Sequence, residues 1–225
     1  MTTPTTHTTS TDSKAWKNRL NKRHAAERRF RFYTLFATLL GIGFVFVLFT
    51  SIVLNGYTAF QQTFIRLSID FDVEILDPKG EKDRDALSRA NYAALVKVAL
   101  RTQFPDVKAR RDKKMLYRLI SSGGAFELRD RVLADPGILG TTKSVWLPAD
   151  DEVDMIIKGH VERNTPEIAR RIKDKQLVWL DELAERGAIE KQFNMAFFTN
   201  GDSREPELSG VRGAMMGSVF MLLVT

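Results

Sequence analysis

The sequence predicts an α+β protein in which a transmembrane anchor helix precedes a helix-rich extracytoplasmic domain and the start of a second transmembrane helix. Three observations lead to this fold class. One run of 23 residues carries no charge, a basic cluster comes directly before it, and strand-like and helix-like apolar patterns both follow it. The 225 residues divide accordingly into four segments, at residues 1–31, 32–54, 55–209 and 210–225.

The uncharged run covers residues 32–54, which contain no Asp, Glu, Lys, Arg or His. As a helix this run reaches about 34 Å, enough to cross a hydrocarbon core of about 30 Å. We therefore expect a transmembrane helix. A cleavable signal peptide matches less well, because its apolar part is usually only about 7–15 residues long and a small-residue cleavage site should follow.

The net charge of +6 is concentrated in residues 1–31. This arm has eight Lys and Arg against Asp12 and Glu27, whereas residues 55–209 have 25 basic and 26 acidic residues. Basic residues beside one end of a membrane helix hold that end in the cytoplasm. We therefore expect a basic cytoplasmic arm, disordered over its Thr- and Ser-rich residues 1–13, and a periplasmic domain over residues 55–209. No nucleic-acid partner is expected.

The first half of the domain shows one strand and three helices. Residues 67–76 alternate between apolar and polar side chains, which predicts a half-buried strand. Residues 77–80 (Asp-Pro-Lys-Gly) predict a turn. Helical spacing follows over residues 85–104, a strongly basic helix over 106–120, and a short helix over 125–133, with the break at residues 121–124.

The second half of the chain predicts two short strands, at residues 143–147 and 155–157, around an acidic loop. Thr165 is expected to cap a long helix that has Pro166 at its first position and ends at Gly187. From residue 211 to Thr225 the chain is apolar except for Arg212, and as a helix it reaches about 22 Å. By its length this segment is either a buried core helix or the first two-thirds of a second membrane helix that is cut short at Thr225. Gly213 and Gly217 give it a small-residue stripe that suits close helix packing.

We expect no catalytic, cofactor-binding or metal-binding residues and no enzymatic activity. The chain has no cysteine, which excludes thiolate ligands and thiol nucleophiles, and no P-loop, nucleophile-elbow or zinc-protease motif. Several residues are of types that can form a site: His7, His24, His160, Asp150, Asp151, Glu152, Asp154, Ser122, Gly123 and Gly124.

Each of these candidates has a plainer interpretation. The histidines are too scattered to share a metal, and the acidic residues lack the spacing of a calcium-binding loop, so a solvated loop is expected. Residues 122–124 (Ser-Gly-Gly) either hold an anion at a helix N-terminus or simply interrupt the helix. The basic residues 109–118 are expected to form a solvated helix face.

The order of these segments resembles the PstA-type permease subunit of the phosphate ABC importer, in its variant with an extra N-terminal periplasmic domain. The residues that carry the resemblance are Val145-Trp146-Leu147-Pro148-Ala149 with Asp151, Val153 and Asp154; Gln176, Trp179, Leu180 and Asp181; Phe197-Phe198-Thr199; Gly201-Asp202-Ser203-Arg204-Glu205-Pro206-Glu207; and residues 210–213. Residues 201–207, which lead into a glycine-containing apolar segment, are the most specific part.

The resemblance implies an N-terminal fragment of an inner-membrane permease subunit, without the cytoplasmic loop that docks on the ATPase. It also implies a second permease subunit, an ATPase subunit, a periplasmic phosphate-binding protein and the lipid bilayer as partners. ATP hydrolysis would then belong to the ATPase subunit, and the periplasmic insert would be an interaction module. The alternatives are a signal-anchored periplasmic sensor or scaffold domain and an anchored periplasmic enzyme.

Overall fold

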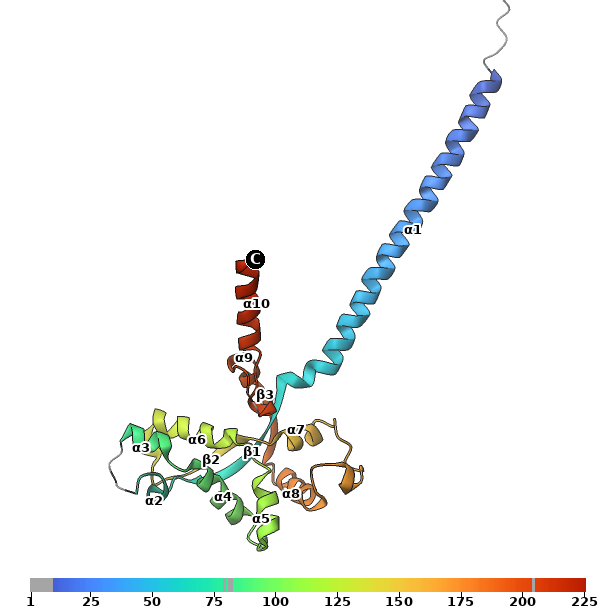
Figure 1. Cartoon of the computed structure of the whole chain (residues 1–225). Coiled ribbons are helices and arrows are strands. Elements are labelled where there is room, and N and C mark those ends of the chain that lie inside the picture. Colours follow the sequence, from blue (N-terminus) through green and yellow to red (C-terminus); the bar gives the residue numbers. More distant parts are fainter. Residues whose placement is uncertain (1–9, 79, 81–82, 204) are drawn as a thin grey trace, which may run out of the picture. The chain divides into compact units, whose positions relative to one another are not determined.

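A computed structural model describes residues 10–78, 80, 83–203 and 205–225 of the chain (Figure 1). The chain divides into two compact units, residues 1–56 and 57–225. The first unit contains one long helix, and the second contains a three-stranded antiparallel sheet with helices around it. The α+β class predicted from the sequence is therefore confirmed.

Helix α1 (Ser10–Gly56) runs without interruption for 47 residues. It confirms the helix predicted over residues 32–54 and extends it back through most of the basic arm. Residues 10–13 were expected to be disordered, and this is wrong, because adding residues to an existing helix costs far less than starting one. The remaining residues of the predicted disordered segment, 1–9, lie outside the described residues.

The sheet has the strand order β2-β1-β3, with both neighbours antiparallel to the central strand. Its strands are β1 (Gln61–Asp70), β2 (Thr142–Pro148) and β3 (Ile189–Phe193), and the short 3-10 helix η1 (Tyr57–Phe60) precedes β1. The register places Leu67 opposite Val145 and Ile65 opposite Ile189. The prediction of β2 is confirmed, whereas β3 was not predicted.

The strand predicted over residues 67–76 is right only as far as Asp70. Residues 73–76 form a single helical turn, α2 (Val73–Leu76), because a carboxylate oxygen of Asp72 accepts a hydrogen bond of 2.8 Å from the backbone N–H of Glu74. This cap starts a helix within an alternating apolar pattern. The turn predicted next is present, with Gly80 at a φ of 71° and its N–H donating to the carbonyl of Asp77.

The helix predicted over residues 85–104 is two helices, α3 (Arg84–Arg89) and α4 (Tyr92–Gln103). The break follows from Asn91, whose side-chain oxygen accepts a hydrogen bond from the N–H of Ala94 and caps α4. Helix α5 (Arg110–Tyr117) is shorter than the predicted span of 106–120, partly because Ile120 pairs with Ala149 in an isolated β-bridge. Helix α6 (Gly123–Ala134) begins two residues earlier than predicted, and η2 (Pro136–Ile138) follows it.

The strand predicted at residues 155–157 is wrong. These residues end helix α7 (Asp151–Ile157), which starts where a carboxylate oxygen of Asp150 accepts a hydrogen bond from the N–H of Glu152. The three-residue spacing of the buried Val153 and Ile156 is helical rather than strand-like. The predicted acidic loop is therefore the first turn of this helix.

The start predicted for the next helix, at Thr165, is also wrong. Residues near it form only a 3-10 turn, η3 (Glu167–Ala169), and α8 (Asp174–Glu185) starts later. The side chain of Gln176 reaches back to accept a hydrogen bond of 3.0 Å from the N–H of Lys173, which fixes that start. The end is as predicted: Gly187, with a φ of 62°, follows the last turn of α8 and donates to the carbonyl of Ala184.

The last described elements are α9 (Met195–Thr199), η4 (Pro206–Leu208) and α10 (Arg212–Val224). Helix α10 confirms a helix within the terminal apolar segment, whereas α9 and η4 were not predicted. One face of β1, formed by Ile65, Leu67 and Ile69, is fully buried in the hydrophobic core. Helices α4, α6 and α7 supply much of the rest of that core.

Candidate membrane-facing surface

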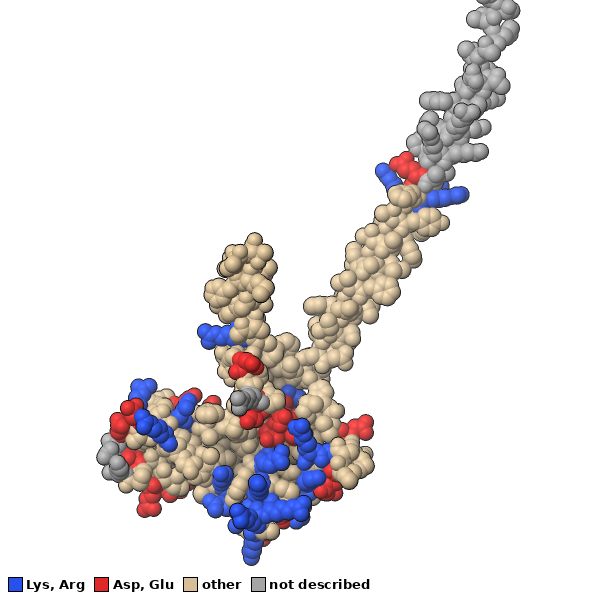
Figure 2. Space-filling model, viewed as in Figure 1, with Lys and Arg blue, Asp and Glu red and all other residues tan. Residues whose placement is uncertain are grey.

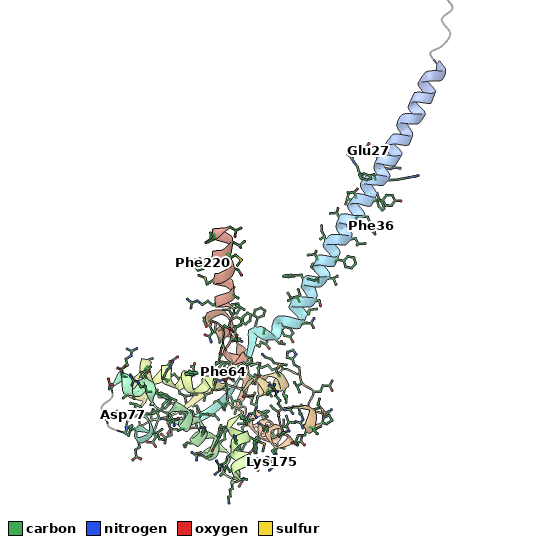
Figure 3. The ribbon with its side chains drawn as sticks, in the orientation of Figure 1. Glu27, Phe36, Phe64, Asp77, Lys175 and Phe220 are labelled. Carbon is green, nitrogen blue, oxygen red and sulfur yellow. The ribbon has the colours of Figure 1, made fainter. Side chains whose placement is uncertain are left out.

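Helix α1 exposes its apolar side chains. The segment Glu27–Phe60 has 34 residues, and its most apolar 18-residue window has a mean hydropathy of 2.4, so by length and composition it can cross a membrane. None of this window is buried. Phe36, for example, projects outward from the helix and is 56% exposed (Figure 3). Because water-soluble surfaces rarely expose contiguous apolar patches of this size, α1 is the first candidate for contact with lipid.

Helix α10 has the same character. Arg212 is the only charged residue in it, so most of the helix carries no charged side chain (Figure 2). Phe220 projects outward (Figure 3), and Leu222 is 79% exposed. A Cβ atom added at Gly213 or Gly217 would meet no atom within 4 Å, so the predicted small-residue stripe faces none of the described neighbours.

Four phenylalanine rings gather at the base of α10, from three separate elements of the same compact unit. We call Phe60, Phe193, Phe197 and Phe198 the aromatic platform. Phe198 stacks on Phe60 and on Phe193, with ring centroids 5.8 and 5.6 Å apart and interplanar angles of 11°. Phe197 meets Phe60 and Phe198 edge-on, at 5.5 and 5.1 Å. These are the offset and T-shaped geometries that favour aromatic pairs.

The aromatic platform is ordered but only partly covered. Phe60 is 40% exposed, Phe198 44% and Phe193 59%. Fully burying a Phe side chain contributes about 1.5–3 kcal/mol relative to leaving it exposed. A surface that covers these three rings therefore gains several kcal/mol.

Backbone hydrogen bonds hold the aromatic platform and the start of α10 together. Asn194 caps α9 by accepting from the N–H of Phe197 at 3.0 Å, and its own N–H donates to the carbonyl of Phe60 at 2.9 Å. The N–H of Val211 donates to the carbonyl of Phe197 at 2.8 Å. Helix α10 is thus fixed to α9, which is fixed to η1.

Gly210 is the point of closest approach in this junction. A Cβ atom at this position would lie 2.4 Å from the carbonyl oxygen of Asn200 and 2.6 Å from that of Ala196. Both are backbone atoms, which cannot move away as a side chain can. Position 210, two residues before the start of α10, must therefore be glycine for steric reasons.

Residues 121–124 hold the segment before α10 in place. The Ser121 hydroxyl donates to Oε1 of Glu207 at 2.5 Å and accepts from the N–H of Gly123 at 2.9 Å. The side-chain amide of Gln62 donates to the backbone carbonyl of Glu207 at 2.8 Å. Contrary to the linker interpretation, Gly123 and Gly124 lie inside α6, and the carboxylate beside its first turn belongs to the chain itself.

The acidic residues among 150–154 lie at the N-terminus of α7, and two of them form salt bridges with other residues of the chain. Asp154 pairs with Lys158 at 2.5 Å and accepts a hydrogen bond from the N–H of Thr63 at 2.9 Å, and Glu152 pairs with Arg171 at 2.7 Å. Burial, together with the hydrogen bond and charge of Asp151, raises the pKa of Asp150 to about 7. The charge of Glu207 acts in the same direction.

A cleft of about 610 Å³ lies between α7 and the segment that leads to α10. Its lining includes Asp154 and Lys158, which pair with each other, and Glu207, whose Oε1 accepts from Ser121 while its buried Oε2 has no hydrogen-bond partner among the described residues. The charges of Asp154 and Lys158 are therefore directed at each other.

The three histidines are expected not to share a metal. His160 is exposed, and its ring nitrogen Nε2 lies 2.9 Å from the hydroxyl of Thr58. His7 lies outside the described residues, and His24 is part of α1. Among the residues that the structure describes, no group of three or more His, Asp or Glu side chains is placed to hold a metal ion.

The basic segment 109–118 forms α5, and Lys and Arg side chains gather over it (Figure 2). Asp112 on this helix pairs with Lys175 of α8 at 2.6 Å. Arg110, Arg111, Lys114 and Arg118 are exposed, as expected for a solvated face.

Sequence reasoning did not find the aromatic platform. Its rings come from residues 60, 193, 197 and 198, and nothing in their spacing indicates that Phe60 meets a segment more than 130 positions later. The available signal was local: residues 192–201 contain three Phe and a Met and no charge, which is unusual for an exposed loop.

Comparison with known protein families gives a match. A family model described as "Domain of unknown function (DUF3333)" matches residues 17–167, which include most of α1 and the domain as far as η3. No curated protein and no solved structure matches the chain. Because the matched region covers well over half of its residues, the chain belongs to the DUF3333 family.

Proposed function

We propose that this chain is the N-terminal part of the inner-membrane permease subunit of an ATP-driven phosphate importer. In this proposal α1 anchors the chain in the bilayer, residues 57–209 form a periplasmic interaction module, and α10 begins the next membrane helix. ATP hydrolysis belongs to a partner ATPase, and the chain itself is not an enzyme.

The observation that carries the proposal is the exposed, uncharged stretch of α1. It is long enough for a bilayer, and its apolar window has no cover within the described chain. The basic residues before it indicate which end remains in the cytoplasm. A second exposed apolar helix, α10, is fixed by backbone hydrogen bonds to the end of the domain, so the chain has an apolar helix on each side of residues 57–209.

The phosphate assignment rests on the resemblance carried by residues 145–149, 197–199 and 201–207. In the structure, part of this set forms the junction before α10: Phe197 and Phe198 belong to the aromatic platform, and Glu207 bonds to Ser121. The near-neutral charge of the domain favours a role in protein contact over one in attracting phosphate.

The topology can be tested directly, because the chain has no cysteine. Val178→Cys places a thiol on α8 at a position that is 63% exposed, and Ala15→Cys places one in the basic arm. A membrane-impermeant maleimide should label Val178→Cys in intact spheroplasts and Ala15→Cys only after permeabilisation. The reverse order of labelling would overturn the proposed topology.

The transport role needs a separate measurement. Uptake of labelled phosphate under phosphate limitation should fall strongly when the gene is deleted and return with the unaltered full-length gene. If uptake is unchanged and the chain is nevertheless anchored, the signal-anchored sensor or scaffold becomes the better assignment.

A further inference from the structure

We infer that the aromatic platform rests on the lipid headgroup region, so that this side of the domain lies against the bilayer instead of standing clear of it in water. This inference rests on the proposed membrane anchoring. It goes further by naming the surface that touches lipid and the depth at which that surface lies.

The first argument is chain continuity. Phe60 ends η1, which follows α1 directly in the sequence, and Phe197 and Phe198 lie on α9, which is bonded to the start of α10 through Val211. The rings thus lie close to the points where both proposed membrane helices leave the lipid. A surface at these points meets the bilayer before it can meet a soluble partner.

The second argument concerns depth. The platform is built from a 3-10 turn, the end of a strand and a five-residue helix, whose backbone groups are not all bonded within one regular element. Irregular backbone exposed to lipid is not tolerated in the hydrocarbon core. Aromatic side chains next to polar groups are instead typical of the membrane–water interface, and Asn194 and Asn200 lie on either side of α9.

The third argument is charge. No charged residue lies between Lys191 and Asp202, so the platform can approach lipid without desolvating an ion from its own segment. Arg212, which is exposed in the first turn of α10, is placed to meet phosphate groups of the headgroups. Tyr57, 53% exposed on η1, adds a side chain favoured at the same depth.

The fourth argument is rigidity. The four rings are already stacked or edge-on to one another, and Asn194 ties α9 to η1. The exposed faces therefore do not need to be ordered when they meet the bilayer, and little conformational entropy opposes the contact.

The experiment uses the full chain, with one cysteine introduced at a time and labelled with a nitroxide. Phe193→Cys reports on the most exposed ring of the platform. Val178→Cys reports on a surface that is expected to face water, and Val45→Cys reports on the central part of the uncharged stretch 32–54 of α1. After reconstitution into vesicles of phosphatidylethanolamine and phosphatidylglycerol, collision rates with oxygen, which concentrates in lipid, are compared with those of a water-soluble nickel chelate.

We expect the oxygen-to-nickel collision ratio to be highest at position 45, intermediate at 193 and severalfold lower at 178. A label at 193 that behaves like the label at 178 would show that the platform stands in water. Low collision rates with both reagents at 193 would show that protein covers it. Either result at position 193 overturns the inference about the platform. If the label at position 45 is exposed to lipid in the same experiment, the anchoring proposal still stands.

A nickel-accessible label at position 45 would instead overturn the proposed anchoring, and the inference with it. Phe198→Cys is the second variant, and it should give the same intermediate ratio. Melting temperatures in detergent, compared with the unaltered chain, show whether a low signal at either ring position comes from loss of the fold.

Discussion

The Ser121 hydroxyl lies 2.5 Å from Oε1 of Glu207, which is 86 positions later in the chain. Both residues are buried. The bond joins the start of α6 to the segment that leads into α10. A side-chain hydrogen bond therefore connects the domain to the segment before the proposed second membrane helix, in addition to the covalent chain.

Replacing Ser121 with Ala should weaken this connection. The change removes a donor to the Glu207 carboxylate and an acceptor for the N–H of Gly123, leaving buried polar groups without partners. We expect a loss of about 1–3 kcal/mol in the free energy of unfolding. Chemical unfolding of the full chain in detergent measures it. Ser122→Ala, at an exposed neighbouring position, is the matched control, and equal losses in both variants would contradict the assignment.

Replacing Gly210 with Ala should be costlier than an ordinary Gly→Ala change. The new Cβ would lie within 2.6 Å of two backbone carbonyl oxygens, so the junction between α9 and α10 must shift. We expect a loss of about 1–3 kcal/mol, as for overpacking in a dense site. Gly201→Ala serves as the control because a Cβ there meets no atom within 4 Å. Thermal melting of the two variants separates steric strain from the general effect of removing a glycine.

Asp150 should make the fold less stable as the pH rises. Burial raises its pKa from 3.8 to about 7 in the folded state, so the folded protein keeps a proton that the unfolded chain has already released. The stability contributed by this group therefore falls as the pH rises from about 4 to 7 and stays low above that.

The comparison variant is Asp150→Asn, which keeps a capping oxygen for α7 but cannot ionise. We expect it to be more stable than the unaltered chain at pH 8, by about 1–2 kcal/mol once solvent screening of this partly exposed group is counted. At pH 4 the difference should be small. Unfolding midpoints measured at both pH values test this, and a difference that does not depend on pH would rule out the ionisation of Asp150 as its cause.

The Asn91 cap of α4 should contribute about 1 kcal/mol to the free energy of unfolding. Its side-chain oxygen accepts a hydrogen bond of 3.1 Å from the N–H of Ala94. Asn91→Ala should lower the unfolding free energy by that amount, whereas Asn91→Asp should retain most of it. Circular dichroism during unfolding follows the change. If the Ala and Asp variants are equally destabilised, the loss does not come from the cap.

Patterns of neighbouring residues in the sequence predicted those helices and strands whose ends depend on neighbouring residues alone. The alternation that begins at Leu67 found the last part of β1, and Gly187 found the end of α8. The predictions failed where one polar side chain overrides a pattern: Asp72 caps a helical turn in an apparent strand, and Asn91 divides an apparent helix. The periodicity of apolar residues does not show where such caps form, because each cap depends on a single hydrogen bond.

The candidate surface was predictable only in part. The length and lack of charge of residues 32–54 identify the apolar helix, since bilayer thickness sets a simple requirement. The stacking of Phe60 on Phe198 and the bond from Ser121 to Glu207 join residues that are far apart in sequence. Only the folded arrangement of the sheet brings such pairs together.

The continuity of α1 through the basic arm has a mechanical consequence. With the proposed topology, residues 10–31 continue the membrane helix on its cytoplasmic side as a rod of about 33 Å. No proline interrupts the helix, so a small tilt of the embedded part swings the far end through a larger arc. In that topology a tilt of the embedded part would move residues 10–31 with it as one continuous helix.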